Sequence, residues 1–293
     1  MISEIEAKKV LTYHENPFPT HWDVNPYRGC TVGCKYCFAQ YAHQYLGLPD
    51  FFKDIVVKTN ISEQLDKELS SKKWQKNQIK IGGTTDLYQQ IEQKYELMPK
   101  IYSVIKKHKN PIFIQTKSDL ILRDKAIITE LSKITTVDIA TSVSIFDEKN
   151  RKIFEPGATS TLSRIKMIAS FNGISRNAIL GFMPIIPYLS DTDENLEQIF
   201  SAAHQNGIKS VITSFLFLNG AAKSSFFKII EKHFPQLLDK YKLLYKSQNL
   251  DPVYKSEMTA KINAIKDKYQ FTNQFEPVLP QKSNQLSLFD EPN

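Results

Sequence analysis

Apolar residues alternate along the chain between short continuous runs and longer stretches with helical spacing. The short runs predict strands over 78–81, 111–116, 137–144, 177–183 and 209–215. Between them, apolar residues three or four positions apart predict helices over 61–70, 97–108, 124–133, 159–171 and 192–205. With one more strand just before Cys30, there are about six βα units. This alternation predicts an α/β fold with parallel strands, most simply a complete or partial (β/α) barrel.

The N-terminal segment differs from this central pattern. Residues 1–20 contain Pro17 and Pro19, which block helix formation, and we expect an irregular lead-in there. The barrel core is then predicted to occupy residues 21–220. Catalytic residues of such barrels lie at the carboxyl ends of the strands.

The C-terminal part has a different composition. Residues 221–248 and 253–268 have lysine-rich amphipathic patterns, which predict two helices within 221–270 that pack on the barrel or lean over its mouth. From 271 to 293 the chain is rich in Gln, Asn and Pro, and we expect a flexible, extended tail.

The composition is that of an ordinary globular protein, with 293 residues, 41% hydrophobic and 24% charged. No run of eighteen apolar residues is present, and the first ten residues lack the apolar core of a secretory signal. We therefore predict no membrane partner, and the absence of a possible disulfide framework among the three cysteines predicts a cytoplasmic protein. The net charge is +7, which fits a solubilising surface or a field that attracts polyanions and favours nucleic acid only weakly.

The three cysteines are the most informative residues. Cys30, Cys34 and Cys37 lie within eight positions, and an odd, clustered set cannot form a disulfide framework. Thiolates suit zinc or an iron–sulfur cluster. Zinc would need a fourth ligand, for which His43 is the nearest histidine, although a surface role is its default. A cubane cluster held by three cysteines instead leaves its fourth iron open to a small molecule.

The context of these cysteines, NPYRGC-x3-C-x2-C, resembles the motif of radical S-adenosylmethionine (SAM) enzymes. The resemblance implies a 4Fe-4S cluster whose open iron chelates the amino and carboxylate groups of SAM. One electron, from a donor such as flavodoxin or ferredoxin, then cleaves SAM to a 5′-deoxyadenosyl radical. It also implies a partial (β/α)6 barrel of the TIM type, with Tyr36 packing on the adenine.

Further blocks resemble the spore-photoproduct-lyase-related subgroup, often labelled DNA repair photolyases. They are GGTTDLYQQIE (82–92), TKSDLILRD (116–124), FEP (154–156) with Arg164, and PIIPYLSD (184–191). Together with the cysteine motif they cover roughly residues 20–215. The resemblance implies a lyase-type reaction on a DNA lesion.

Several strand ends carry candidate cofactor ligands. The resemblance implies that Gly82, Gly83 and Thr84 bind the amino group of SAM; the alternative is a plain turn. Lys117 would pair with the SAM carboxylate, or else be a solvated loop lysine. Ser142 and Ser144 would bind the carboxylate or ribose, or be interior hydroxyls satisfied by the backbone.

We expect the charged side chains around these strand ends to have mainly structural roles. Asp86 would hold substrate, orient its loop or cap the next helix. We expect ion pairs between Arg123 and Asp124 and between Glu155 and Arg164.

The chain departs from the subgroup in one respect. In the lyase, a fourth cysteine near the end of the second strand donates a hydrogen atom to the product radical, and the matching position here is Gly83. This chain therefore has no thiol for that step. Tyr36 and Tyr88 are the candidates to relay a hydrogen atom instead, and Asp86 is a further catalytic candidate.

The tail contains Gln285-Leu286-Ser287-Leu288-Phe289, which resembles the motif that docks bacterial replication and repair proteins on the sliding clamp. Gln285 would supply hydrogen bonds, while Leu286, Leu288 and Phe289 would fill an apolar pocket. The alternative is a segment that folds back on the barrel.

The sequence is compatible with three functions. The first is a radical SAM enzyme that acts on a nucleic acid, with a DNA lesion as the expected target. The second has the same chemistry but modifies RNA, a peptide or a small molecule. The third is a zinc-stabilised clamp adaptor without catalysis.

Overall fold

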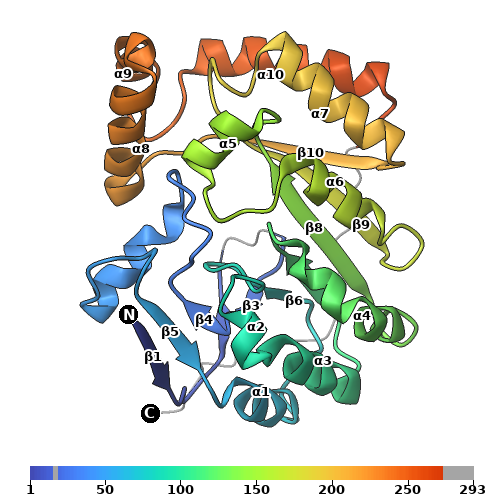
Figure 1. Cartoon of the computed structure of the whole chain (residues 1–293). Helices are drawn as coiled ribbons and strands as arrows, with labels where there is room; N and C mark the ends of the chain where they lie inside the picture. Colours follow the sequence, from blue (N-terminus) through green and yellow to red (C-terminus); the bar gives the residue numbers. More distant parts are fainter. Residues whose placement is uncertain (16–18, 273–293) are drawn as a thin grey trace.

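A curved sheet of six parallel strands forms the centre of the computed structural model, which describes residues 1–15 and 19–272 (Figure 1). In order the strands are β3 (Trp22–Val24), β6 (Ile79–Ile81), β7 (Ile112–Gln115), β8 (Val137–Val143), β9 (Asn177–Ile185) and β10 (Ser210–Phe215). Each pairs in parallel with the next, and β2 (Leu11–Tyr13) adds an antiparallel edge beside β3. The sheet stays open between β2 and β10, which confirms the partial (β/α)6 barrel.

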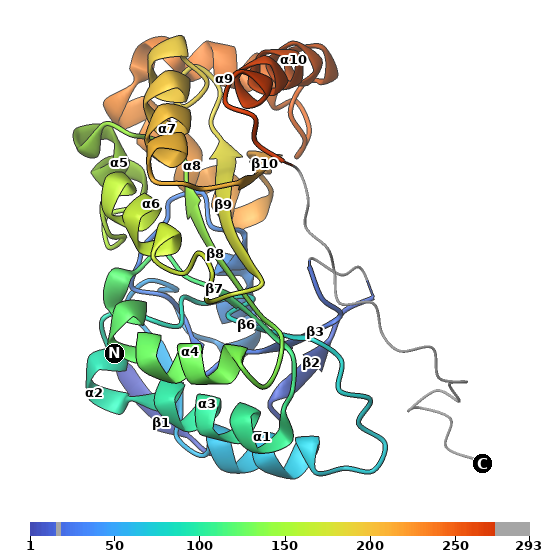
Figure 2. The same ribbon diagram turned by 90° about the vertical axis from the view of Figure 1, so that its right-hand side faces the viewer.

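Helices follow the strands and cover the outer face of the sheet (Figure 2). They are α1 (Ile61–Leu69), α2 (Glu92–Tyr95), α3 (Leu97–His108), α4 (Lys125–Ser132), α5 (Glu148–Phe154), α6 (Thr161–Ala169) and α7 (Asp193–Gln205). Ile79 and Ile81 of β6 join the core beneath these helices, with Ile101 of α3. Because strand residues alternate in direction, Lys80 and Gln115 face the inside of the barrel, where both line a cavity.

The N-terminal segment is more ordered than expected. The irregular lead-in predicted for residues 1–20 is wrong, because β1 (Ile2–Ile5) and β2 lie within it. β1 pairs with β5 (Ile55–Lys58), which in turn pairs with β4 (Tyr27–Arg28) in a second, small sheet. A 3₁₀ helix, η1 (Phe38–Leu46), follows the cysteines. The strand pairings join segments far apart in sequence, and no local pattern of residues 1–20 predicted them.

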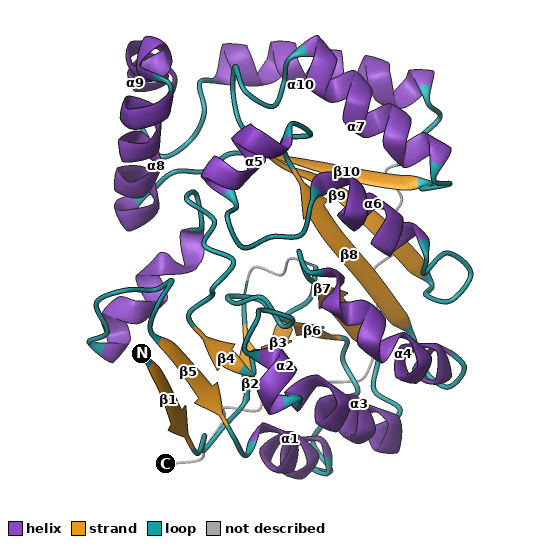
Figure 3. Ribbon diagram, viewed as in Figure 1, coloured by secondary structure: helices purple, strands orange, loops and turns teal. Residues whose placement is uncertain are grey.

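The C-terminal helices pack at one end of the barrel (Figure 3). A single helix over 221–248 is wrong: α8 (Gly220–His233) ends before η3 (Pro235–Leu237) and α9 (Leu238–Leu244). Pro235 has no N–H to continue the helical hydrogen bonds. α8 lies against η1, with a hydrogen bond of 3.0 Å between Ser225 and Gln40, and α10 (Pro252–Lys268) packs on α7.

The predicted tail begins within the described region. Phe271 is buried against Phe200, and Thr272 pairs with Ser210 of β10. Residues 273–293, including the clamp-like motif at 285–289, lie outside the described residues. Among the helices of residues 1–15 and 19–272, none combines the length and apolarity that crossing a bilayer demands.

Candidate functional site

The carboxyl ends of the central strands and the cysteine loop surround a cavity of about 500 Å3. Most of the predicted site residues line it: Cys30, Cys34, Tyr36, Cys37, Gly82, Gly83, Thr84, Asp86, Lys117 and Ser142. Residues that are separated by more than 100 positions therefore meet at one place. Ser144 and Tyr88 do not line this cavity.

The cysteine loop is held tightly against the end of β6. Gly29 and Gly33 have φ values of 80° and 72°, which an L side chain adopts only with strain, as the tight loop requires. The carbonyl of Gly29 accepts hydrogen bonds from the Thr85 hydroxyl at 2.6 Å and the Gln89 amide at 3.3 Å. Gln89 also accepts from the backbone N–H of Thr31 at 2.9 Å. These hydrogen bonds fix the backbone that carries the cysteine side chains.

The thiols themselves suit an iron–sulfur cluster. Cys30 and Cys34 are buried and Cys37 is half-buried. Burial raises the pKa of Cys30 to about 12 and that of Cys37 to about 11, so ligation must displace protons. Within the described ranges, no three or more His, Cys, Asp or Glu side chains surround one metal-ion position. Three thiols on one loop are soft ligands of the kind that hold an iron–sulfur cluster.

His43 does not line the cavity with the cysteines. Its Nε2 lies 2.7 Å from the carbonyl oxygen of Asp54, and its ring packs edge-on against Phe51. The residue is 3% exposed, so the expected surface role is wrong as well. It helps to hold η1 against the segment before β5.

The end of β6 has a conformation that requires glycine. Gly82 has a φ of 89°, and a Cβ on Gly83 would overlap the carboxylate of Asp23. The N–H groups of Gly83 and Thr84 both donate to Asn25 Oδ1, at 2.8 and 3.0 Å. Asn25 was missed by the sequence analysis, although it is the first residue of the NPYRGC block. It fixes the backbone that borders the cavity.

Asp86 joins the ends of β6 and β7. Its carboxylate accepts from the Lys117 N–H at 2.7 Å, the Thr116 hydroxyl at 2.6 Å and the Tyr88 N–H at 2.9 Å. Burial raises the pKa of this carboxyl group. Of the three roles expected for Asp86, these contacts support the one in which it orients its loop.

Tyr88 points away from the cavity. Its hydroxyl lies 2.8 Å from that of Tyr102 and donates to Asp124 at 3.0 Å. The expected ion pair between Arg123 and Asp124 is present at 2.8 Å, and Arg123 also binds Glu92 at 2.8 Å. This region is a buried structural network, so between the two tyrosines only Tyr36 faces the cavity.

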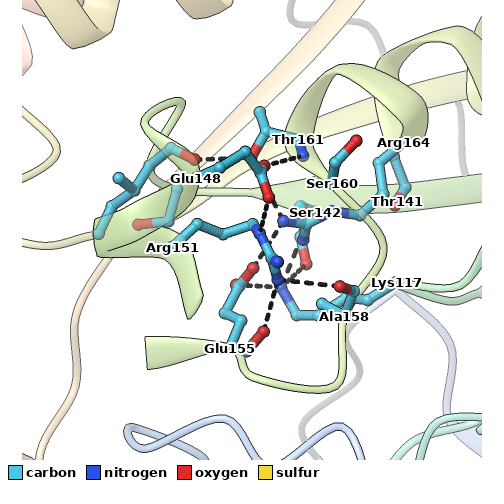
Figure 4. Close-up of polar contacts among 12 residues, drawn as sticks. Lys117, Thr141, Ser142, Glu148, Arg151, Glu155, Ala158, Ser160, Thr161 and Arg164 are labelled. Atoms are coloured by element: carbon cyan, nitrogen blue, oxygen red, sulfur yellow. Dashed lines mark hydrogen bonds and ion pairs between the residues drawn. The ribbon is translucent and has the colours of Figure 1, made fainter. Parts of the chain in front are cut away.

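Glu155 is the centre of a charged network that includes Lys117 and Arg164 (Figure 4). One carboxylate oxygen is 2.8 Å from the ammonium of Lys117, and the other is 2.6 Å from the guanidinium of Arg164, which confirms the predicted pair. Lys117 also donates to the Ser142 hydroxyl at 2.7 Å, so it is not a solvated loop lysine. Tyr36 donates its hydroxyl proton to Glu155 as well.

This network keeps Glu155 ionised. Burial alone raises the pKa of the carboxyl group, but the charges of Arg164 and Lys117 outweigh it and lower the pKa to about 2. Tyr36 is held by this carboxylate, and burial raises its pKa well above the usual value, so its phenol stays protonated. The result is a fixed cation, a hydroxyl and an aromatic ring on the cysteine side of the cavity.

The two predicted serines differ in position. Ser142 lines the cavity, whereas the hydroxyl of Ser144 donates to the carbonyl of Pro184 at 2.6 Å. Ser144 thus matches the alternative of an interior hydroxyl satisfied by the backbone. Pro184 lines the cavity, and the carbonyl of Pro187 accepts from Tyr241.

Three aromatic side chains at the cavity are unusually exposed. Phe38, Tyr41 and Phe217 line it, and their exposed fractions are 53%, 46% and 41%. The sequence analysis did not single them out. The run Tyr36, Phe38 and Tyr41 beside the cysteines was the available signal. Exposed rings of this kind can stack on a planar ligand.

Comparison with known proteins places the chain in a family. The radical SAM superfamily profile matches residues 24–220. The uncharacterized protein Rv2578c of Mycobacterium tuberculosis is 30% identical over 284 residues, which are 95% of this chain and 84% of that protein. The uncharacterized protein MJ0683 of Methanocaldococcus jannaschii is 28% identical over 80% of this chain and 84% of its own length.

Solved structures show the same fold. A structure of spore photoproduct lyase complexed with dinucleoside spore photoproduct matches 92% of this chain and 79% of the lyase, with a TM-score of 0.64 and 13% identity. A lyase variant with bound AdoMet and the same dinucleoside also gives a TM-score of 0.64, at 14% identity over 92% of this chain and 78% of the lyase. The chain belongs to the radical SAM superfamily, whose enzymes use a 4Fe-4S cluster and SAM.

Proposed function

We propose that this protein cleaves SAM reductively at a cluster held by Cys30, Cys34 and Cys37 and applies that chemistry to a nucleic acid, with a lesion in DNA as the substrate. The observation that carries the proposal is the cavity, because one space is bordered by all three thiols and by the strand ends of β6, β7 and β8. A cofactor bound at the thiols would share this space with a substrate.

The cluster, when bound, supplies the electron that cleaves the sulfonium of SAM. The side chains of the protein bind SAM and hold it in position. Lys117 offers a cation for its carboxylate, Tyr36 a ring face and Ser142 a hydroxyl, all on the cysteine side of the cavity. Glu155 holds Lys117 and Tyr36 in place.

Three features support a nucleic-acid substrate. The fold is that of spore photoproduct lyase, one structure of which holds a dinucleoside photoproduct. The rings of Phe38, Tyr41 and Phe217 can stack on a base that leaves the duplex. The net charge is +7, and exposed lysines on α8, α9 and α10, such as Lys228, Lys242 and Lys255, can contact phosphates.

The direct test of this substrate class uses UV-irradiated and unirradiated DNA of one sequence. The holoenzyme is reduced with SAM present, and the lesions are counted by chromatography. We expect lesions to disappear only when SAM, reductant and intact cysteines are all present, and we expect DNA binding to weaken steeply with salt. If irradiated DNA is unchanged while RNA or a peptide is modified, the proposed substrate is wrong although the SAM chemistry stands.

Two partner hypotheses remain predictions. Docking on the sliding clamp would use Gln285, Leu286, Leu288 and Phe289, which lie outside the described residues. Flavodoxin or ferredoxin would deliver the electron. A purely structural zinc adaptor finds little support, given the position of His43 and the family of the chain.

A further inference from the structure

A row of four aromatic rings lies on the hairpin formed by β2 and β3 and on the loop that follows α1. Tyr13 and Trp22 are register partners in this hairpin, with ring centroids 5.1 Å apart. The His21 ring stacks on Tyr13 at 5.5 Å with an interplanar angle of 7°, and Trp74 meets Trp22 edge-on at 5.2 Å. Figure 2 shows the hairpin and the loop on the same side of the molecule. Two segments that are distant in sequence therefore present one continuous row of rings.

The hairpin end of the row is open to solvent. Tyr13 is 47% exposed, and His21 is exposed as well. Both ends of the row are held in place, because Nδ1 of His21 lies 2.9 Å from the carbonyl oxygen of His14 and the indole N–H of Trp74 donates to Asn110 at 2.7 Å. Flat side chains that are already ordered and accessible can stack on planar groups of a ligand at little cost in conformational entropy.

The loop that carries Trp74 is strongly basic. Its sequence from 70 to 78, SSKKWQKNQ, holds three lysines and no acidic residue. All three, Lys72, Lys73 and Lys76, are exposed. Rings and positive charges side by side match a single-stranded nucleic acid, in which stackable bases alternate with phosphates. An acidic protein segment would satisfy the lysines but offers few planar groups for the rings.

The row begins at the rim of the cavity that the cysteines line. His14 and Thr20 line that cavity, and they are the chain neighbours of Tyr13 and His21. β2 is also the edge strand at which the sheet stays open. A strand whose target base enters the cavity would therefore meet these rings with the nucleotides beside that base.

We propose that this row binds single-stranded nucleotides that flank the target base of a nucleic-acid substrate. Bases stack on the pair of Tyr13 and His21, Trp22 and Trp74 support that pair edge-on, and the lysines of the loop contact phosphates. These contacts read no sequence, because every base has a face that can stack. The inference rests on the proposed nucleic-acid substrate and adds where the strand lies and that it is unpaired there.

Tryptophan fluorescence tests the inference directly, because Trp22 and Trp74 are the two tryptophans of the chain. The holoenzyme with SAM is titrated anaerobically with a short oligothymidylate, with a strand of the same length that lacks its bases, and with a duplex. We expect oligothymidylate to change the tryptophan emission, and the base-free strand to bind about 5- to 100-fold more weakly without that change. Equal emission changes with single-stranded and duplex DNA would overturn the claim that the strand is unpaired.

Two substitutions at position 13 separate stacking from other effects. Tyr13→Ala should weaken oligothymidylate binding about 5- to 100-fold, whereas Tyr13→Phe, which keeps the ring, should remain within about twofold of wild type. The control is Leu162→Ala on α6, which removes an apolar side chain that is 39% exposed and should leave binding unchanged. Urea unfolding checks the stability of each variant. Wild-type affinity in Tyr13→Ala would overturn the inference.

The remaining outcomes separate this inference from the proposed function. If the wild-type protein binds DNA with no change in tryptophan emission, the strand lies elsewhere, and the inference fails while the nucleic-acid substrate stands. If polyglutamate binds as tightly as oligothymidylate with the same emission change, the surface accepts acidic protein segments, and the inference is overturned. If no oligonucleotide binds, both are overturned. The wild-type titrations use no substitution, so their result does not depend on a variant that folds.

Discussion

The carboxylate of Asp23 lies against the α-carbon of Gly83, in the space that a side chain at position 83 would need. Here a side chain at position 83 and the observed position of Asp23 exclude each other. This wall of the cavity therefore presents the carboxylate of Asp23 and no side chain from position 83.

We predict that Gly83→Ala destabilises the protein by about 1–3 kcal/mol, because the new methyl group overlaps Asp23. In the double variant with Asp23→Ala, the same glycine substitution should cost less than about 1 kcal/mol. The urea midpoints of the four proteins in this cycle measure the coupling. Equal costs in both backgrounds would show that the two residues do not compete for space.

Glu155→Gln should destabilise the protein by about 3–5 kcal/mol near pH 7. The substitution leaves the ammonium of Lys117 and the guanidinium of Arg164 without their shared carboxylate, and Arg164 is fully buried. The exposed pair of Glu130 and Lys133 supplies the control, since Glu130→Gln should leave the stability almost unchanged. Urea unfolding measures both, and similar costs would contradict the central role of Glu155.

The effect of Glu155→Gln on stability should depend on pH. The pKa of Glu155 is lowered from its ordinary value of 4.5 to about 2 in the folded protein, so as the pH falls the unfolded chain takes up the proton before the folded protein does. Its stabilising contribution is complete above about pH 4.5 and is lost as the pH falls through about 2. The stability difference between wild type and Glu155→Gln should shrink over that interval in the cluster-free protein. A difference that stays constant down to pH 2 would contradict the ion-pair account.

Lys117→Ala should weaken SAM binding to the oxidised holoenzyme about tenfold or more, because a charge-assisted contact is lost. Iron and sulfide content should stay unchanged, since Lys117 is no cluster ligand. Lys133→Ala, which removes an exposed lysine, is the matched control. Calorimetric titration with SAM checks the prediction, and an unchanged affinity would assign Lys117 a role only in the network around Glu155.

Deletion of residues 285–289 should abolish binding of the protein to the bacterial sliding clamp while SAM cleavage continues. The reason is that Leu286, Leu288 and Phe289 are the apolar anchors of the motif. Surface plasmon resonance with immobilised clamp measures the loss. Replacement of Ser287 by Ala, within the same segment, should have little effect, and unchanged affinity after deletion would reject the motif.

The strands and the cysteines could be predicted because their signals are local. The apolar runs at 78–81 and 137–144 end next to Gly82 and Ser144, and parallel strands bring such ends to one edge of a sheet. The cysteine spacing needed no structure. The side chains at positions 117 and 142 followed from the same rule, and both line the cavity.

The remaining features depend on contacts that no local pattern records. β1 forms only because β5 lies beside it, and the break between α8 and α9 depends on Pro235 within an amphipathic pattern that reads as continuous. Ser144 and Tyr88 were plausible ligands by position, but the Ser144 hydroxyl donates to the carbonyl of Pro184 and the Tyr88 hydroxyl donates to Asp124. Asp23 stood out only when its unpaired oxygen and its contact with Gly83 were visible.

The most direct test of the central claim is the formation of 5′-deoxyadenosine. The protein is reconstituted anaerobically with iron and sulfide, reduced with dithionite and given SAM, and the product is measured by liquid chromatography. We predict product from the wild-type protein and none from Cys34→Ala, which lacks one of three cluster ligands. A wild-type protein that carries its full cluster yet forms no 5′-deoxyadenosine, or a Cys34→Ala variant that forms as much as wild type, would contradict the account.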